Sequence, residues 1–274
     1  MQTTGIAYLT HTWNPIVMRC EPISEACKHC WHLEVADRHS RNHQLPAFRR
    51  IAAAGRSAPI LLNGDHDRGG ELSKPSRRKK PARIGVEFMG DLWHHGIPDD
   101  WIDLVVAEVR SAPQHQFFFL TKRIDRARSY WRTRSVPPNA LMGTTVENQV
   151  RADERLPHLC AIDARRWLSV EPLIAPVDLC RAIGTAGMYC IELVVAGCEK
   201  PPYRKTDDDW FRVLRRQCAD AGVLFFLKQA VREGGSVITK PMLDGRQHTD
   251  LPSLKGTSGS ITVGPAGSRK ARTT

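Results

Sequence analysis

The sequence contains no long apolar run, and it has few cysteines for its length. A membrane-spanning helix needs roughly 20 consecutive apolar residues, and no segment of the 274 residues approaches that. The first residues lack the cationic and then apolar pattern of a secretory signal peptide. Eight cysteines are far sparser than in a secreted disulfide scaffold, so we expect free thiols or metal ligands in a reducing compartment. These absences predict a cytoplasmic protein with no membrane partner.

The composition also excludes a disordered or fibrous chain, because 41% of the residues are hydrophobic and 25% are charged. The formal charge of +11 is concentrated in two segments that contain no acid: residues 74–83 hold six basic residues and residues 254–274 hold four. Like-charge runs of this kind are usually solvated and lack fixed structure. They also make nucleic acid a candidate partner, bound electrostatically through these two segments.

Short apolar runs alternate with helical patterns from residue 83 onward, which predicts repeated βα units. The predicted strands are 6–10, 83–89, 116–121, 141–146, 166–170, 193–197 and 223–228. Helices are predicted at 28–42, 99–110 and 207–221 from their apolar spacing and their starting residues. Nearly continuous apolar strands such as 117–120 are typical of a parallel sheet that is covered on both faces.

Polar residues follow nearly every predicted strand, at 12–14, 90–91, 122–123, 147–148, 171, 199 and 228–229. In a (β/α) barrel the carboxyl ends of all strands meet at one mouth, whereas an open sheet spreads them along a line. We therefore predict an α/β protein with a partial (β/α) barrel of six to eight parallel strands. Some of these residues, such as Asp91, Thr121 and Asn148, would serve equally well as helix caps.

The rest of the chain is less regular. Residues 46–82 are predicted to form a basic loop insertion, whose Gly-rich part at 64–70 lacks the spacing of a phosphate-binding loop. Asp244-Gly245 predicts a turn or hairpin that closes the body. The expected organisation is one barrel domain over residues 1–252 and a disordered basic tail over 253–274.

The strongest chemical signal is the spacing Cys20-x6-Cys27-x2-Cys30. Three cysteines in one loop can hold a zinc ion, with His29, His32 or His11 as the fourth ligand. They can also hold an iron–sulfur cluster that leaves one iron open to a small molecule, or remain free thiols. The spacing alone leaves these alternatives open. The other cysteines are not grouped; Cys198 lies at a strand end, and the remaining four fall in or beside helical patterns.

Several sequence blocks follow one another in an order that resembles a known family. They are Thr12-Trp13-Asn14-Pro15 before the three cysteines, then FMGDLWHHGIPDDW, FFFLTKRIDRA, GTTVENQVRADERLP, RWLSVEPLIAPVDL, ADAGVLFFLKQ and KPMLDGR. From about residue 8 to residue 252 the chain resembles a phage-associated family of unknown function that carries a three-cysteine motif and is similar to radical SAM proteins. The resemblance implies a partial (β/α) barrel that binds a [4Fe–4S] cluster and S-adenosylmethionine.

The chain departs from that family pattern at three places. Met18-Arg19 precede Cys20 where the family usually has a glycine, and Trp31 follows Cys30 where it has a tyrosine. A strand end expected to carry two glycines before a glutamate reads Gly197-Cys198-Glu199. These changes remove no cysteine, but they leave the activity less firmly implied than the fold.

The resemblance also implies roles for individual residues. Cys20, Cys27 and Cys30 would hold the cluster, and His29 would lie against the adenine of the cofactor. Asp91 would accept a hydrogen bond from the cofactor's amino group. The remaining candidates are Glu147, Glu171 and Glu199 for the ribose or the substrate, and Lys122, Arg123 and Lys228 for a carboxylate or a substrate anion. Salt bridges among these same groups are the alternative.

Three functional hypotheses follow. The first is a radical SAM enzyme, in which an electron donor reduces the cluster, S-adenosylmethionine is cleaved, and a hydrogen atom is abstracted from an unknown substrate, with nucleic acid or a protein as candidates. The second is a non-enzymatic, zinc-stabilised nucleic-acid-binding protein; Glu147, Glu171 and Glu199 argue against it, because a polyanion-binding face should not be lined with acids. The third is a cluster-bearing sensor or scaffold without turnover.

Overall fold

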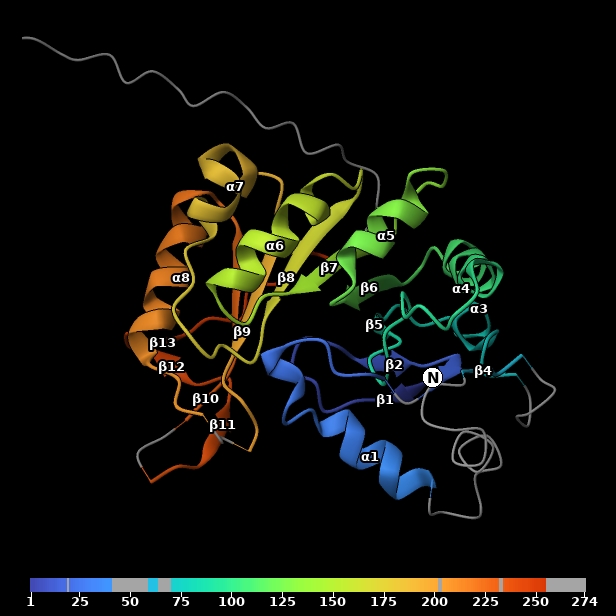
Figure 1. Cartoon of the computed structure of the whole chain (residues 1–274), viewed down its shortest axis with the longest axis horizontal. Helices are drawn as coiled ribbons and strands as arrows, with labels where there is room; N and C mark the ends of the chain where they lie inside the picture. Colours follow the sequence, from blue (N-terminus) through green and yellow to red (C-terminus); the bar gives the residue numbers. More distant parts are fainter. Residues whose placement is uncertain (19, 41–58, 64–69, 202–203, 232–233, 255–274) are drawn as a thin grey trace, which may run out of the picture.

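The computed structural model describes residues 1–18, 20–40, 59–63, 70–201, 204–231 and 234–254, and the central element is a nine-stranded, mostly parallel sheet (Figure 1). In spatial order its strands are β1 (Gln2–Thr3), β2 (His11–Trp13), β5 (Arg83–Val86), β6 (Gln116–Thr121), β7 (Ala140–Thr145), β8 (Arg165–Val170), β9 (Leu193–Gly197), β10 (Leu224–Val231) and β11 (Val237–Thr239). Neighbours from β2 to β10 are parallel, and the edge strands β1 and β11 are antiparallel.

The strands follow one another in space in the order of the chain, without a reversal. Because parallel crossovers are right-handed, an unreversed order places the connecting helices on one face of the sheet, and they form an arc around the strands (Figure 1). These helices are α4 (Asp99–Ser111), α5 (Ile124–Trp131), α6 (Gln149–Cys160), α7 (Leu179–Met188) and α8 (Asp208–Asp220). The helix α1 (Trp31–Ser40) lies apart from this arc, beyond the other side of the strands.

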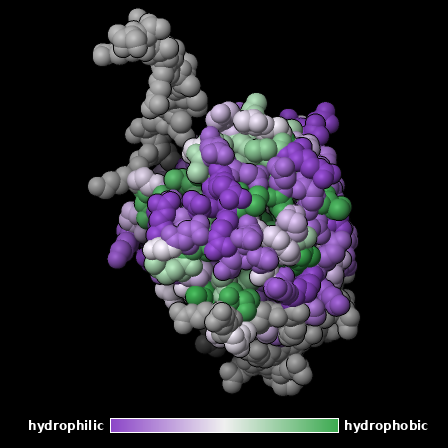
Figure 2. All heavy atoms as spheres, turned by 90° about the vertical axis from the view of Figure 1, so that its left-hand side faces the viewer, coloured by the Kyte–Doolittle hydropathy of each residue, from purple (hydrophilic) through white to green (hydrophobic). Residues whose placement is uncertain are grey.

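Sequence signals explain where these helices begin and which side they bury. Asn148, Asp178 and Asp207 each cap the following helix by accepting a backbone N–H bond with the side chain. In α4 the buried residues Ile102, Val105, Val106 and Val109 recur at helical spacing and face the sheet. Away from that buried side, the face turned to the viewer in Figure 2 is largely hydrophilic, with small separate hydrophobic patches.

The strands alternate between two hydrophobic clusters. Phe117 and Phe119 pack into the larger cluster under the helices, whereas Phe118 belongs to a second cluster on the opposite face. This inner cluster also contains Tyr8, Leu9, Leu141, Trp167, Leu193, Val195 and Phe226. The sheet is therefore apolar on both faces, as the sequence predicted.

The sheet is concave toward the inner cluster. The Tyr8 ring lies 6.2 Å from the Phe118 ring on β6 and 6.0 Å from the Phe226 ring on β10. Strands four positions apart are roughly 19 Å apart in a flat sheet, and their side chains stand perpendicular to it. Two rings from such strands can meet one tyrosine only if the sheet curves around it.

A C-terminal strap, residues 248–252, crosses the same concave face. Thr249 forms a β-bridge with Phe226 on β10, and Leu227 donates a backbone bond to His248 at 2.9 Å. Three residues later, the Pro252 carbonyl accepts a bond from Arg83 Nη2 on β5 at 2.8 Å. A short segment thus joins β10 to β5, although four strands separate them in the sheet.

The smaller elements lie around this sheet. β3 (Ile16–Val17) pairs with β4 (Ile60–Leu61), and the three-residue helix η1 (Glu25–Cys27) precedes α1. The predicted hairpin is confirmed: β12 (Met242–Leu243) pairs with β13 (Arg246–Gln247) across Asp244-Gly245, both with positive φ. None of the described helices has the length and apolar character needed to cross a bilayer.

Two sequence predictions are wrong in their details. The first predicted strand, 6–10, is not a strand: β1 ends at Thr3 and β2 begins at His11, because Tyr8 and Leu9 fill the concave face of the sheet and do not pair within it. Part of the basic run is helical and forms α3 (Lys74–Arg77). Pro75 is buried in this helix, and the Ser76 N–H donates to the Glu108 carboxylate at 2.7 Å. Residues 41–58 and 64–69 of the predicted insertion and residues 255–274 of the tail lie outside the described residues.

Candidate functional site

A cavity of about 630 Å³ opens where the parallel strands end, on the concave side of the sheet. Its walls come from almost every strand, and Gln2 from the β1 edge and Thr239 from the β11 edge both line it. The loop between β3 and α1 forms another wall and carries Cys20, Cys27 and Cys30. The cavity therefore gathers chain segments from both edges of the sheet and from the cysteine loop.

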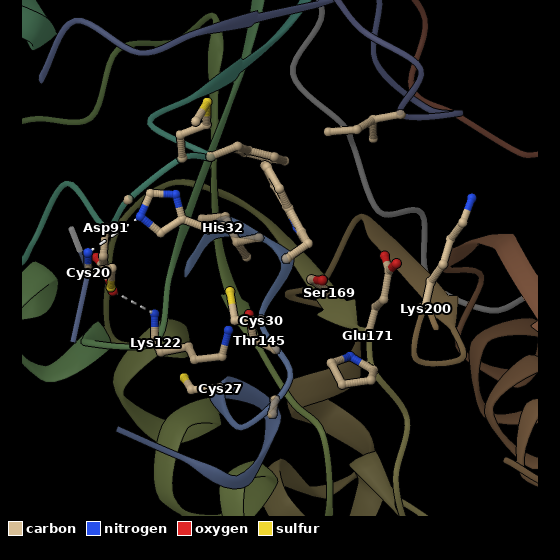
Figure 3. Close-up of a pocket in the computed structure, with 18 of the residues that line it drawn as sticks. Cys20, Cys27, Cys30, His32, Asp91, Lys122, Thr145, Ser169, Glu171 and Lys200 are labelled. Atoms are coloured by element: carbon tan, nitrogen blue, oxygen red, sulfur yellow. Dashed lines mark hydrogen bonds between the residues drawn. The ribbon is translucent and has the colours of Figure 1, made fainter. Parts of the chain in front are cut away.

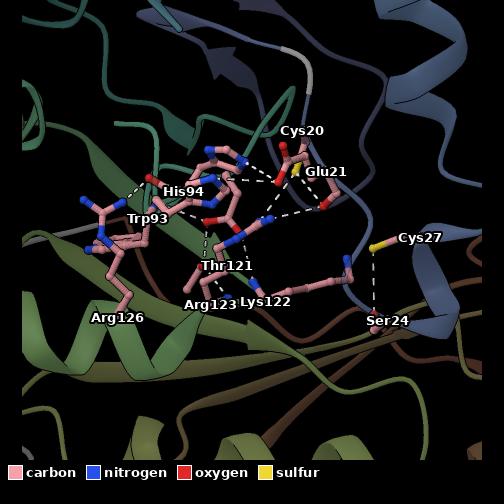
Figure 4. A network of polar contacts seen from close by, with 12 residues as sticks. Cys20, Glu21, Ser24, Cys27, Trp93, His94, Thr121, Lys122, Arg123 and Arg126 are labelled. Carbon is pink, nitrogen blue, oxygen red and sulfur yellow. Dashed lines mark hydrogen bonds and ion pairs between the residues drawn. The ribbon is translucent and has the colours of Figure 1, made fainter. Parts of the chain in front are cut away.

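All three cysteines are free thiols at this wall (Figure 3). Cys27 is buried at the end of η1, while Cys20 and Cys30 are half-buried. Tight turns set their spacing, because Cys27 N–H bonds Ser24 O at 2.9 Å and Cys30 N–H bonds Cys27 O at 3.3 Å. The side chain of Lys122 runs from the β6 end toward Cys27 (Figures 3 and 4).

The three sulfurs do not form the compact group that a single zinc ion requires. Zinc–sulfur bonds of about 2.3 Å in tetrahedral geometry place sulfurs less than about 4 Å apart. Within the described ranges, the one group of three ligand atoms close enough for a metal ion is Glu21, His94 and His95. An iron–sulfur cluster suits a wider arrangement, because each thiolate binds a different iron.

The three histidines predicted as a fourth zinc ligand differ in their positions and contacts. His32 Nε2 accepts the backbone N–H of Cys20 at 3.4 Å, which occupies that nitrogen. His11 bonds Thr10 and does not line the cavity. His29 does line the cavity, beside Cys30.

Two of the thiols have opposite pKa shifts. Burial and the nearby Asp91 raise the pKa of Cys20 to about 11, although Arg123 opposes this. At Cys27 burial also acts to raise the pKa, but Lys122 and hydrogen bonds from the Ile23–Ser24 region outweigh it, so the pKa of Cys27 is lowered. Ser24 Oγ lies 3.8 Å from Cys27 Sγ and contributes to that effect. The thiolate form is therefore favoured more at Cys27 than at Cys20.

Asp91 uses both of its oxygens within the protein. Oδ1 accepts from Trp93 N–H at 3.1 Å and Thr121 Oγ1 at 2.6 Å. Oδ2 accepts from Lys122 N–H at 3.2 Å and from Arg123 Nη1 at 3.1 Å. A carboxylate has about four acceptor positions, so Asp91 has no position left for the amino group that the resemblance would assign to it.

Glu21, His94 and His95 lie close together, but their hydrogen bonds oppose metal binding. His94 Nδ1 accepts the Gly96 N–H at 3.1 Å, so a neutral His94 carries its proton on Nε2. Burial lowers the pKa of His94, which keeps the ring neutral. The protonated Nε2 faces Glu21 Oε2 at 3.6 Å and has no lone pair for a metal ion. Within this cluster, the contacts of His94 and His95 with Glu21 join the loop after Cys20 to the loop between β5 and α4.

The remaining predicted residues divide into two groups. Glu171 and Lys228 line the cavity as an ion pair, and Glu199 lines it paired to Arg204 at 3.0 Å. Glu147 is not among the lining residues; it is fully buried and paired to Arg155 at 2.8 Å. For Glu147 the sequence prediction of a cofactor or substrate contact is not supported.

Several lining residues escaped the sequence prediction. Thr145 and Ser169 line the cavity from the last residues of β7 and β8, and they were missed because the prediction considered the polar residues that follow each strand and not those within it. Glu87 directly follows β5, where its φ of 56° turns the chain away from the sheet. It was missed because the predicted strand extended to residue 89.

The comparisons with known proteins give a family match over most of the chain. The family model described as "Protein of unknown function (DUF5131)" matches residues 3–252. No curated protein and no solved structure gives a significant match. The matched residues include the three cysteines, the parallel strands from β2 to β10 and nearly all of the cavity lining. The chain therefore belongs to the family DUF5131, whose function is not known.

Proposed function

We propose that this protein is an enzyme of the radical SAM type, which holds a [4Fe–4S] cluster through Cys20, Cys27 and Cys30. The observation that carries the proposal is the position of three free thiols on one wall of a cavity at the carboxyl ends of a parallel sheet. Parallel α/β proteins place their ligand sites at these strand ends. The cavity extends past the cysteines and leaves room for S-adenosylmethionine and part of a substrate.

The proposal includes a partial (β/α) barrel. Its support is the unreversed strand order, the curvature around Tyr8, and the contact of both sheet edges with the cavity. Closure is incomplete, because β1 and β11 are the edges of the sheet and are not paired to one another.

The donor set fits a cluster better than a zinc ion. Three thiols are present, and their sulfurs are not grouped closely enough for a single ion. Of the histidines predicted as a fourth ligand, His11 lies outside the cavity lining, His32 Nε2 accepts the Cys20 N–H, and His29 lines the cavity. Together with S-adenosylmethionine, such a cluster supplies hydrogen-atom abstraction from carbon, a one-electron chemistry that side chains do not provide alone.

The chain's own residues would bind and shield the reacting groups. His29 lines the cavity and would contact the adenine, and the Glu171–Lys228 and Glu199–Arg204 pairs would offer charged partners for hydroxyl, amino and carboxylate groups. Lys122 lines the same cavity, and its side chain runs toward Cys27. The inner cluster around Tyr8 and Trp167 closes the cavity below and excludes water from that side.

Anaerobic reconstitution with iron and sulfide tests the ligand set. We expect the wild-type protein to gain the broad visible absorption of an iron–sulfur cluster, and Cys27→Ala to lose it. Cys190→Ala is the matched control, because Cys190 is exposed and lies outside the cavity. Stoichiometric zinc in place of iron and sulfide in the wild-type protein would refute the cluster.

A second measurement separates an enzyme from a sensor or scaffold. The reconstituted protein is incubated with S-adenosylmethionine and a strong reductant, and 5′-deoxyadenosine is measured by chromatography. We expect the product to form in the wild-type protein and in Cys190→Ala, and to be absent from Cys27→Ala. A stable cluster without any product would refute enzymatic turnover.

A further inference from the structure

The guanidinium of Arg123 makes contacts that point to a role at the cysteine loop. Arg123 is the N-cap residue of α5, two residues after the end of β6, and its side chain is 10% exposed. Nη1 lies 3.1 Å from Asp91 Oδ2 and 3.7 Å from Cys20 Sγ, and Nη2 donates to the Glu21 carbonyl at 3.2 Å (Figure 4). One cation thus connects the β5–α4 loop to the cysteine loop.

We infer that Arg123 is a positioning residue for the cluster ligand Cys20, which it holds in place while setting the charge beside that sulfur. The inference rests on the proposed function. It differs from the role that the resemblance implied, in which Arg123 would bind a carboxylate of the cofactor or substrate. The fork of the guanidinium is already occupied by protein acceptors, as is the carboxylate of Asp91.

Asp91 is the fixed anchor of this arrangement. Four protein donors hold its two oxygens, and two of them are backbone N–H groups of Trp93 and Lys122. A carboxylate held in this way cannot move to follow a ligand, so it fixes the guanidinium. The guanidinium in turn fixes the Glu21 carbonyl and the Cys20 sulfur. Arginine suits this task, because its planar fork binds two acceptors with a defined geometry.

The chemical consequence concerns reduction of the cluster. Reduction adds one negative charge, and a cation with an N–H group beside a ligand sulfur stabilises the more negative state. Arg123 should therefore raise the reduction potential, and the negative charge of Asp91 should lower it. Loss of either side chain would loosen the loop in a similar way, but the two charge effects have opposite signs.

Redox titration of the reconstituted protein without S-adenosylmethionine tests this inference. We expect Arg123→Gln to shift the reduction potential to more negative values and Asp91→Asn to shift it to more positive values. Arg123→Lys keeps the charge and should recover part of the potential. Arg126→Gln is the control: Arg126 lies on the same helix and binds the His94 and Ile97 carbonyls, but it does not contact Cys20. The reduction potential of the Arg126→Gln variant should equal that of the wild type.

The outcomes distinguish this inference from the proposed function. A wild-type protein that takes up no cluster overturns both. A wild-type cluster whose potential is unchanged in Arg123→Gln, or shifts in the same direction in Arg123→Gln and Asp91→Asn, overturns only the inference. If Arg123→Gln fails to take up iron, the inference is tested by Arg123→Lys and Asp91→Asn, through the sign of the shift in reduction potential that each variant shows. Weaker binding of S-adenosylmethionine with an unchanged potential would assign Arg123 to the cofactor instead.

Discussion

At the scale of single residues, Glu87 is a fully buried carboxyl whose two oxygens have different surroundings. Oε2 accepts the Ile16 N–H at 3.1 Å, whereas Oε1 has no partner within the described part of the chain. Burial raises the pKa of Glu87 well above its ordinary value; the bond from Ile16 opposes this and Asp91 adds to it. The folded protein therefore prefers the neutral carboxyl.

We expect Glu87→Gln to stabilise the protein at neutral and alkaline pH. The unfolded chain ionises this carboxyl near pH 4.3, but the folded chain does so only at higher pH. The stability that Glu87 contributes in acid is therefore lost as the pH rises toward its raised folded pKa. The amide does not ionise and can still accept the bond from Ile16.

Urea denaturation of the apo protein at about pH 5 and about pH 8 measures this effect. The gain in the free energy of unfolding should be on the order of 1–3 kcal/mol at the higher pH, and smaller at the lower one. A gain of the same size at both values would contradict a shifted carboxyl. Glu108→Gln at a partly exposed position is a control for removal of one negative charge.

The sequence was informative about individual site residues only where short-range geometry decides their positions. Cys20, Cys27 and Cys30 are close in the sequence, so their spacing predicted that one loop could direct all three toward a common centre, and all three line one cavity. Glu147 was assigned to the cavity because it follows a strand, yet the chain turns into α6 at that point and Glu147 pairs with Arg155 eight residues later. Beyond the end of a strand, the alternation of side chains no longer predicts direction.

At the scale of elements, β7 and β8 fit together through a glycine. The Trp167 indole lies over Gly143 and donates to the Phe119 carbonyl at 2.9 Å. A Cβ at residue 143 would lie 2.3 Å from Trp167 Nε1. The largest side chain of the inner cluster therefore requires the absence of a side chain on the neighbouring strand.

We expect Gly143→Ala to destabilise the protein by about 1–3 kcal/mol, the usual effect of overpacking a core. Gly143→Ala combined with Trp167→Phe should be less destabilised than the sum of the two single variants, because the smaller ring leaves room for the methyl group. Thermal unfolding of the four proteins completes the cycle. Strictly additive effects would show that the indole moves aside without strain.

The elements themselves were predicted well where apolar runs are continuous. The strands from β6 to β10 lie close to their expected positions, because each is buried on both faces and so reads as an apolar segment. The segment at Tyr8 and Leu9 is also an apolar run in the sequence, but it packs against the concave face of the sheet and is not one of its strands. Burial is visible in a sequence, whereas the choice between pairing in a sheet and packing against it depends on distant residues.

At the scale of the whole molecule, the basic segment and the cavity lie at opposite ends of the strands. The backbone carbonyls of Pro75 and Arg78 accept bonds from His115 and Gln114, which immediately precede the start of β6. The cavity lies where the same strands end. If residues 74–83 bind a nucleic acid, they would recruit it at a distance from the cysteines and would not hold it at the site of reaction.

The C-terminal strap is the part of the chain that we expect to maintain the curvature of the sheet. Truncation after Gln247 removes the bridge to Phe226 and the bond from Arg83 to Pro252, so β10 and β5 lose their connection across the concave face. We expect a lower melting temperature, by about 2–4 °C for each kcal/mol lost. Truncation after Leu254 keeps every one of these contacts and is the matched control. If both truncated proteins melt like the full chain, the inner cluster alone holds the sheet curved and the strap only covers it.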